Sequence, residues 1–526
     1  MSLKKSRTAY AAKNLTASLA SQCIYILIKL VNRTVFISTL GKQYLGVNGL
    51  FSDILTMLSL TELGLDTAIN FKLYKPLAEN DLPRVRVLMK FYKYAYIVVG
   101  ISMIVLGGIL IPFLPYLIKD YATLEPLGIN PIFIFTLYLL QSASSYLFFA
   151  YKSAVIKADQ KEYIIITTNL VSQIVLNIAQ IIVLFTLRDF TLYVVLMIIF
   201  GIGQNFVNAV ISKRLYPAVF EKTRENITKK ELKDTFKDLG AVFASKINTV
   251  ALKATDNVVL SAFVGLSIVG LYSNYLLFYS TIKTLLQRVY NATKAGMGNL
   301  FAVASSEKKY EFFKLMNYIS IMLYGTCAIG VAVLADEFIE CWIGKEYVIK
   351  QPLSIMIGVE IVFVGIKQNL TQIRNVAGLF RQMWFRPLLG VIINVGLSVL
   401  LVQYIGIYGV LLGTITADVL TNYMLDPIII YKFGLDNVRP VSEYYIRNSR
   451  YLIELTIIGF VDMMICGFFI IGHGWVSLIV HFIICGTSVP IYMLTAYRKS
   501  EEAIYVISLI RRATKKIRNR NAKKLI

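Results

Sequence analysis

Residues 14–51 read NLTASLASQCIYILIKLVNRTVFISTLGKQYLGVNGLF, a long apolar run with two basic residues near its middle. A shift of 224 residues places it, without a gap, on residues 238–275, DLGAVFASKINTVALKATDNVVLSAFVGLSIVGLYSNY. Eight of the 38 positions are identical. The pairs are Leu15/Leu239, Ala17/Ala241, Ala20/Ala244, Ser21/Ser245, Lys29/Lys253, Val35/Val259, Gly41/Gly265 and Gly46/Gly270. Because each copy opens a series of six apolar segments, we predict two parallel six-helix repeats related by an axis along the membrane normal.

The composition of the whole chain places it in the membrane class. Only 16% of its 526 residues are charged and 56% are hydrophobic, whereas a soluble globular protein has about 25% charged residues. The mean hydropathy is +0.63, and 13% aromatic residues exclude a disordered chain. Five cysteines in apolar surroundings and two histidines indicate neither a disulfide framework nor a metal site. The sequence predicts an all-α polytopic membrane protein without a cofactor.

A window of about 20 apolar residues, enough to cross a bilayer, finds about fourteen transmembrane helices. Their approximate limits are 14–40, 44–71, 94–118, 130–151, 163–187, 190–212, 239–263, 268–287, 315–335, 352–373, 388–405, 408–431, 451–471 and 475–495. We therefore expect two parallel six-helix bundles around a central cavity and an extra C-terminal helix pair. The expected domains are an N-terminal bundle (1–212), a cytoplasmic linker (213–237), a C-terminal bundle (238–432), helices 13 and 14 (433–495) and a basic cytoplasmic tail (496–526).

The distribution of basic residues predicts the orientation. Of the 54 Lys and Arg residues, 43 lie in one set of loops and the two termini, and only five lie in the opposite loops. The positive-inside rule therefore puts both termini in the cytoplasm. It also accounts for most of the +23 net charge, so the high pI is no sign of nucleic-acid binding. The basic tail resembles a helix on an anionic membrane surface.

Six basic residues lie inside the expected spans, and we take them as candidate substrate contacts. They are Lys29, Arg33, Lys246, Lys253, Lys283 and Lys367. A charge at the bilayer centre costs at least about 2.5–3.5 kcal/mol, so Lys29 and Lys253 should face a bundle interior or a wet cavity. Arg33 and Lys246 lie nearer helix ends, where they could instead reach the interface. Arg33 follows Lys29 by four residues and shares its helical face.

Acidic residues in the spans leave two interpretations open. The candidates are Asp53, Glu62, Asp66, Asp256, Glu360 and Asp418. They could pair with the basic residues, or they could bind a coupling proton or cation.

These features favour transport over catalysis. Two parallel bundles around a polar cavity are typical of an alternating-access transporter, and mid-depth positive charge favours an anionic substrate group. The outer loops are too short for a catalytic domain, and no GxxxxGK[ST] phosphate loop indicates direct use of ATP. We expect a protein that is not an enzyme.

Several short motifs resemble those of the bacterial polysaccharide repeat-unit flippases of the Wzx type, in the multidrug/oligosaccharidyl-lipid/polysaccharide (MOP) exporter superfamily. They are Leu40-Gly41 with Tyr44 and Gly46, residues 62–65 (ELGL), 74–81 (YKPLAEND) and 342–347 (WIGKEY), Arg374-Asn375 with 378–381 (GLFR), and 406–409 (GIYG) with Gly413-Thr414. Together they extend over nearly the whole chain.

The resemblance implies a function, a location and partners. The function is the movement of an undecaprenyl-diphosphate-linked oligosaccharide from the cytoplasmic to the outer leaflet of the bacterial plasma membrane. A cationic cavity would receive the diphosphate, a role assigned to Lys29, Arg33 and Lys253, and helices 13 and 14 would hold the lipid tail. Membrane lipids, the polysaccharide polymerase and its chain-length machinery are the implied partners. The alternatives are a lipid II or teichoic-acid precursor flippase and a drug/cation antiporter of the same superfamily.

Overall fold

The computed structural model describes residues 2–59, 65–119, 121–228, 231–232, 255–349, 352–379, 382–383, 385–468 and 474–522. These residues form helices and short connections, without a strand among them, so the prediction of an all-α protein is confirmed. The chain divides into two compact units, residues 1–273 and 274–526. The domain boundaries expected from the sequence stay a prediction.

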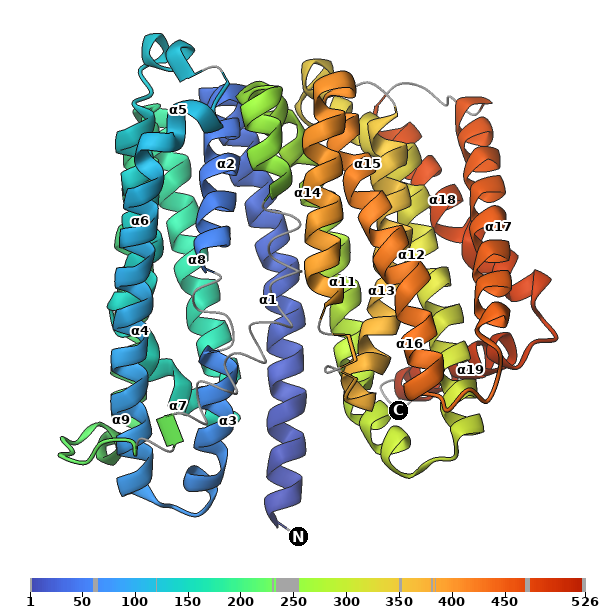
Figure 1. Cartoon of the computed structure of the whole chain (residues 1–526), viewed down its shortest axis with the longest axis horizontal. Helices are drawn as coiled ribbons and strands as arrows, with labels where there is room; N and C mark the ends of the chain where they lie inside the picture. The colour runs from blue at the N-terminus through green and yellow to red at the C-terminus, as the bar shows by residue number, and fades with distance from the viewer. Residues whose placement is uncertain are drawn as a thin grey trace. The chain divides into compact units, whose positions relative to one another are not determined.

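Besides the helical residues 255–263, unit 1 contains nine α-helices and the beginning of another among its described residues (Figure 1). They are α1 Ser2–Leu40, α2 Lys42–Leu58, α3 Leu65–Ala78, α4 Leu82–Leu110, α5 Leu114–Leu117, α6 Pro131–Leu147, α7 Ser153–Ala158, α8 Glu162–Thr186, α9 Phe190–Leu215 and the first part of α11, Leu266–Val303. Short 3-10 turns join them at Ile111–Phe113, Tyr121–Thr123, Glu125–Leu127, Ala150–Lys152 and Pro217–Phe220.

Unit 2 contains the rest of α11 and the helices that follow it. They are α12 Ser306–Ile343, α13 Leu353–Ala377, α14 Arg386–Ile405, α15 Ile407–Asp418, α16 Asp426–Phe433, α17 Val441–Phe468, α18 Trp475–Ala496 and α19 Glu501–Ala522. A 3-10 turn lies at Lys345–Tyr347, and a π-helical segment, Val419–Leu425, joins α15 to α16.

Side-chain caps start several of the long helices. Asp81, Asn130 and Asp189 each accept a hydrogen bond from the backbone amide three residues later, at 3.0 Å. These bonds satisfy amides that have no partner inside the helix. The caps therefore fix the starts of α4, α6 and α9.

Ten described helical stretches are long and apolar enough to cross a membrane, and they match ten of the expected spans. The other four expected spans correspond to α2 with α3, to residues 239–263, to α11 and to the α15–α16 segment. Residues 239–254 lie outside the described part of the chain. The chain is thus a multi-pass membrane protein.

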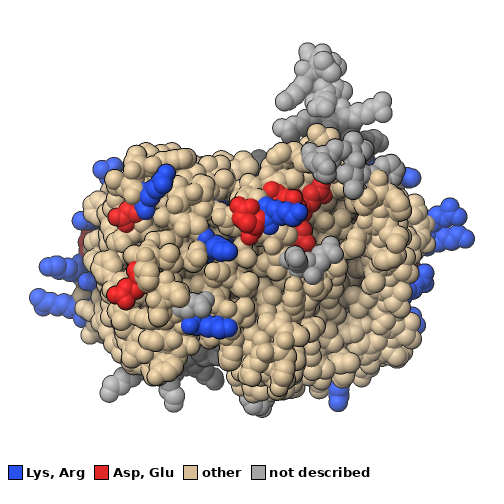
Figure 2. All heavy atoms as spheres, turned by 90° about the horizontal axis from the view of Figure 1, so that it is seen from above, with Lys and Arg blue, Asp and Glu red and all other residues tan. Residues whose placement is uncertain are grey.

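Neighbouring helices pack lengthwise within each unit. In unit 1, α8 lies between α1 and α9, and α6 lies between α4 and α9. In unit 2, α12 contacts α13, α17 and α18, so the extra helix pair packs on a helix of the second bundle. The face shown in Figure 2 is mostly uncharged, with small groups of basic and acidic side chains.

The tail helix α19 begins against α12. Glu502 lies 2.9 Å from the amine of Lys314, and Ala503 and Val506 are buried in the core of unit 2. Burial raises the pKa of the Glu502 carboxyl, but the hydrogen bonds it accepts, first from Lys314, outweigh that effect and leave the pKa below its usual value. Glu502 is therefore ionised at neutral pH and holds the start of the tail. Attachment of the tail to an anionic membrane surface stays a prediction.

Candidate functional site

Helix α1 has an apolar side and, opposite to it, a side that carries Lys29 and Arg33. Ile24, Leu27 and Val31 form an apolar stripe and are 41%, 64% and 55% exposed. At 3.6 residues per turn, Lys29 lies on the opposite side of the helix from this stripe. Lys29 is also exposed, and no described carboxylate forms an ion pair with it. The exposed lysine and the exposed apolar residues thus face opposite directions from α1.

Arg33, one turn after Lys29, is held inside unit 1. Its side chain is only partly exposed, and its guanidinium donates a hydrogen bond to the hydroxyl of Ser273, in the first part of α11. The bond joins a residue of the first repeat copy to one of the second. Arg33 therefore has a hydrogen-bond partner within the protein.

A buried polar seam beside Arg33 was missed by the sequence analysis. The Asn32 amide donates to Asn177 Oδ1 at 2.6 Å and to Gln180 Oε1 at 2.9 Å, and all three side chains are buried. The seam joins α1 to α8. Its signal in the sequence was the spacing of Gln173, Asn177 and Gln180, which puts three amides on one face of an otherwise apolar span.

The matched glycines of the two repeat copies contact each other's helices. A Cβ atom on Gly46 would overlap the carbonyl of Leu266, and one on Gly270 would overlap the carbonyl of Lys42. Lys42 and Leu266 are themselves matched by the 224-residue shift, so the contact is reciprocal. This geometry is that of an approximate two-fold axis between the copies. The structure thus adds a spatial argument for the internal repeat.

The helices α2 and α11 each begin after a glycine with a positive φ angle. Gly41 precedes α2 with a φ of +85°, and Gly265 precedes α11 with a φ of +124°. Residues other than glycine rarely adopt such positive φ angles. The aligned glycines therefore supply a positive φ angle before the helix in both copies.

The basic residues expected in the second copy, Lys246 and Lys253, lie outside the described residues, so their role stays a prediction. The neighbouring Asp256 and Asn257 are described, and both are buried. Asn257 donates a hydrogen bond to the carboxylate of Asp53 on α2. Asp53 is thus engaged with the second repeat copy.

Lys367 is paired with an acidic residue. Its amine lies 3.0 Å from Asp418 Oδ1, which also accepts a hydrogen bond from Asn422 at 2.5 Å. Asn422 belongs to the π-helical segment, a rare geometry that is frequent at functional sites. Of the two interpretations left open for Asp418, the structure shows ion pairing. Another of the predicted basic residues, Lys283, has its amine 6.0 Å from the centre of the Tyr279 ring.

A second buried ion pair was not among the predicted residues. Arg386 Nε lies 2.9 Å from Asp426 Oδ1, and the side chains are only 3% and 1% exposed. Arg374 is close enough to interact electrostatically with both. Arg374 and Arg386 lie between two of the expected spans, and Asp426 lies inside the expected span 408–431, where a charge requires a buried partner.

The remaining acidic candidates are described only in part. Glu360 on α13 is 3% exposed, so it is a buried residue of unit 2. Glu62 and the side chain of Asp66 lie outside the described part of the structure. A coupling role for any of these residues stays a prediction.

The fold is found in solved membrane transporters. An inward-facing multidrug resistance MATE family transporter of the MOP superfamily is 13% identical over 81% of this chain and 100% of its own, with a TM-score of 0.59. An outward-facing MATE family transporter of that superfamily is 13% identical over 82% and 96%, with a TM-score of 0.52. The lipid II flippase MurJ, in an inward closed conformation, is 14% identical over 92% and 98%, with a TM-score of 0.55.

No protein-family model matches the chain, and neither does any curated protein sequence. The structural neighbours are transporters and a flippase rather than enzymes, in agreement with the expectation that this chain is not an enzyme. At these identities the likeness establishes the fold alone. The chain is a multi-pass membrane protein with the fold of MOP-superfamily transporters.

Proposed function

We propose that the chain is a flippase of the Wzx type. It would move an undecaprenyl-diphosphate-linked oligosaccharide, the repeat unit of a polysaccharide, from the cytoplasmic to the outer leaflet by alternating access. The observation that carries the proposal is the exposed Lys29 on the side of α1 away from its apolar stripe, one turn before Arg33. Cations at membrane depth favour an anionic substrate group, and a diphosphate is such a group.

The length of the structural match supports a lipid-linked substrate. The lipid II flippase aligns with 92% of this chain, whereas the two MATE family transporters align with 81% and 82%. The helix pair α17 and α18 presents apolar side chains outward, including Ile453 at 61% and Phe460 at 59% exposed. In the proposal, this pair offers an apolar surface to the polyprenyl tail.

Three acidic residues of the expected spans argue against a cation antiporter. Asp418 and Asp426 are engaged by basic side chains, and Asp53 accepts a hydrogen bond from Asn257. A site for cationic drugs would need acidic groups that are open to the substrate. The proposal also includes a bacterial plasma-membrane location, cytoplasmic termini and cooperation with a polysaccharide polymerase.

The test is complementation of cells depleted of the protein. Depletion should cause lipid-linked repeat units to build up on the inner leaflet, measured by mass spectrometry of extracted lipids after leaflet-selective labelling. Wild type and Lys29→Arg should relieve the build-up. Lys29→Ala should flip about 10–100-fold more slowly, since hydrogen bonds to charged groups contribute about 1.5–3 kcal/mol. Lys222→Ala, at an exposed loop position, is the matched control at equal expression.

Other outcomes of this test would favour a different binding site, substrate or function. Build-up that Lys29→Ala relieves as well as wild type would keep the flippase and reject this binding site. Accumulation of lipid II or a teichoic-acid precursor instead would identify one of the alternative lipid substrates. Altered resistance to cationic drugs without any lipid build-up would favour the antiporter.

A further inference from the structure

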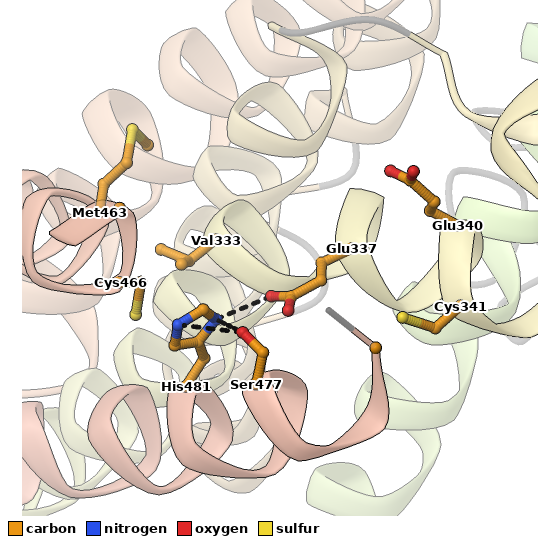
Figure 3. Close-up of a pocket in the computed structure, with 10 residues that line it drawn as sticks. Val333, Glu337, Glu340, Cys341, Met463, Cys466, Ser477 and His481 are labelled. Atoms are coloured by element: carbon orange, nitrogen blue, oxygen red, sulfur yellow. Dashed lines mark hydrogen bonds and ion pairs between the residues drawn. The ribbon is translucent and has the colours of Figure 1, made fainter. Parts of the chain in front are cut away.

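A pocket of about 550 Å³ lies among α12, α17 and α18 in unit 2 (Figure 3). In it, His481 of α18 faces Glu337 of α12, with 2.8 Å between Nδ1 and Oε2. The hydroxyl of Ser477, one turn earlier on α18, lies 3.5 Å from Nδ1 and 3.4 Å from the other ring nitrogen, Nε2. The His481 side chain is 6% exposed and that of Glu337 is 28% exposed. The imidazole thus contacts both a carboxylate and a hydroxyl.

The pair lies below the surface but within reach of water. His481 comes six residues after the start of α18, and Glu337 comes six residues before the end of α12. At about 1.5 Å per residue, both lie about 9 Å inside their helices. Gly474, which precedes α18, also lines the pocket, so the pocket extends to the helix end.

The groups around the ring are acidic or neutral. From α12, Glu337 and Glu340 line the pocket, and no described lysine or arginine does. From α17, Asp462 lies near Cys466 and accepts a hydrogen bond from Ser488 of α18 at 2.6 Å. The nearby thiols, on Cys341, Cys466 and Cys485, are free.

A proton fits this pocket better than a metal ion. Among the described residues, no three His, Cys, Asp or Glu side chains are grouped to hold a metal. A partly buried carboxylate is stabilised by a nearby positive charge or hydrogen bond. Histidine is the side chain that ordinarily gains a charge between about pH 8 and pH 5.

We propose that His481 and Glu337 form a proton-binding site that ties the extra helix pair to α12. In the neutral form, Nδ1–H donates to the Glu337 carboxylate and Nε2 accepts from the Ser477 hydroxyl. A proton from water then binds Nε2, and the Ser477 hydroxyl turns to become the acceptor. The hydrogen bond from the neutral imidazole of α18 to the carboxylate of α12 thereby becomes an ion pair. This site is independent of the transported substrate.

The tryptophans of the chain provide a direct readout. Trp342 and Trp475 both pack against Phe338, next to Glu337, with ring centroids 5.8 Å apart in each case. The chain has three tryptophans, so Trp384→Phe leaves only these two reporters. Purified Trp384→Phe protein in detergent should show one fluorescence transition when titrated from about pH 8 to about pH 5.

Single substitutions in that background assign the transition. His481→Gln should abolish it. His473→Gln should keep it, and it is the matched control because the chain has only two histidines. Glu337→Gln should diminish the fluorescence change, because the imidazolium then has no carboxylate partner on α12 next to Phe338.

Three results would overturn the site. They are a parent protein without the transition, a transition that survives His481→Gln, and a transition lost in His473→Gln. Circular dichroism and gel filtration at pH 8 check that each variant is folded. Should His481→Gln fail to fold, Glu337→Gln decides the matter, since a fluorescence transition of unchanged size would equally reject the pair.

Discussion

Two ion pairs join charged side chains within unit 2. Arg386 and Asp426 are almost completely buried at 2.9 Å, and Lys367 lies 3.0 Å from Asp418. The desolvation of two charges nearly cancels their attraction, so such a pair adds little stability in itself. Loss of one partner is different, because the other charge remains buried without compensation.

We therefore predict that Asp426→Ala lowers the free energy of unfolding by about 3–5 kcal/mol. The positive charges of Arg386 and the neighbouring Arg374 would then face each other without the carboxylate. The double variant Arg386→Met/Asp426→Leu should be much closer to wild type. Thermal unfolding in detergent measures all three proteins.

An exposed ion pair provides the control for this prediction. Lys75 and Glu79 are 4.0 Å apart, with side chains 82% and 59% exposed. Glu79→Gln should change the stability by less than about 1 kcal/mol. Equal effects of Glu79→Gln and Asp426→Ala would show that burial is not the reason for the Asp426 effect.

At the scale of helices, the crossing of α2 and α11 depends on two glycines. Gly46 and Gly270 let each helix approach the backbone of the other. A methyl group at either position would have to displace main chain rather than a flexible side chain. The close approach thus rests on the absence of two Cβ atoms.

Gly46→Ala and Gly270→Ala should each destabilise the protein by about 1–3 kcal/mol through overpacking. The double variant should cost less than the sum, because one separation of the helices relieves both overlaps. Gly108→Ala is the control, since a Cβ there has no heavy atom within 4 Å. Alanine favours a helix over glycine, so this control should be neutral or slightly stabilising in the same thermal assay. A Gly46→Ala variant as stable as the control would contradict the close crossing.

For the whole molecule, the two compact units comprise helices that match the spans expected from hydropathy. Some helices are longer than a membrane requires. With 38 residues, α12 is about 57 Å long, whereas the apolar core of a bilayer is about 30 Å thick. Such helices extend into water, which explains why their observed limits exceed the predicted spans.

The predicted orientation can be tested with single cysteines on a background without native cysteines. Lys222→Cys, in a predicted cytoplasmic segment, should react with a membrane-impermeant maleimide only after the cells are opened. Lys345→Cys, in a predicted outer loop, should react in intact cells. Both positions are exposed, so a difference in labelling reports the side of the membrane. The reverse pattern would overturn the orientation expected from the positive-inside rule.

The sequence predicted the helices well because apolar length is a local property. It also placed Lys29 and Arg33 on one helical face, since helical geometry fixes that relation. It could not pair Lys367 with Asp418 or join Asn32 to Asn177 and Gln180, because these contacts depend on how helices distant in sequence pack. The π-helical segment could not be predicted from the sequence either, because hydropathy carries no signal for a locally widened helical turn.

The reciprocal contact of Gly46 with Leu266 and of Gly270 with Lys42 has an evolutionary consequence. A half-length ancestor that paired with its own copy could make both contacts with a single glycine. After duplication and fusion, two codons encode what one encoded before. Each copy is then constrained by the backbone of its twin, although the side chains around the two glycines are free to diverge.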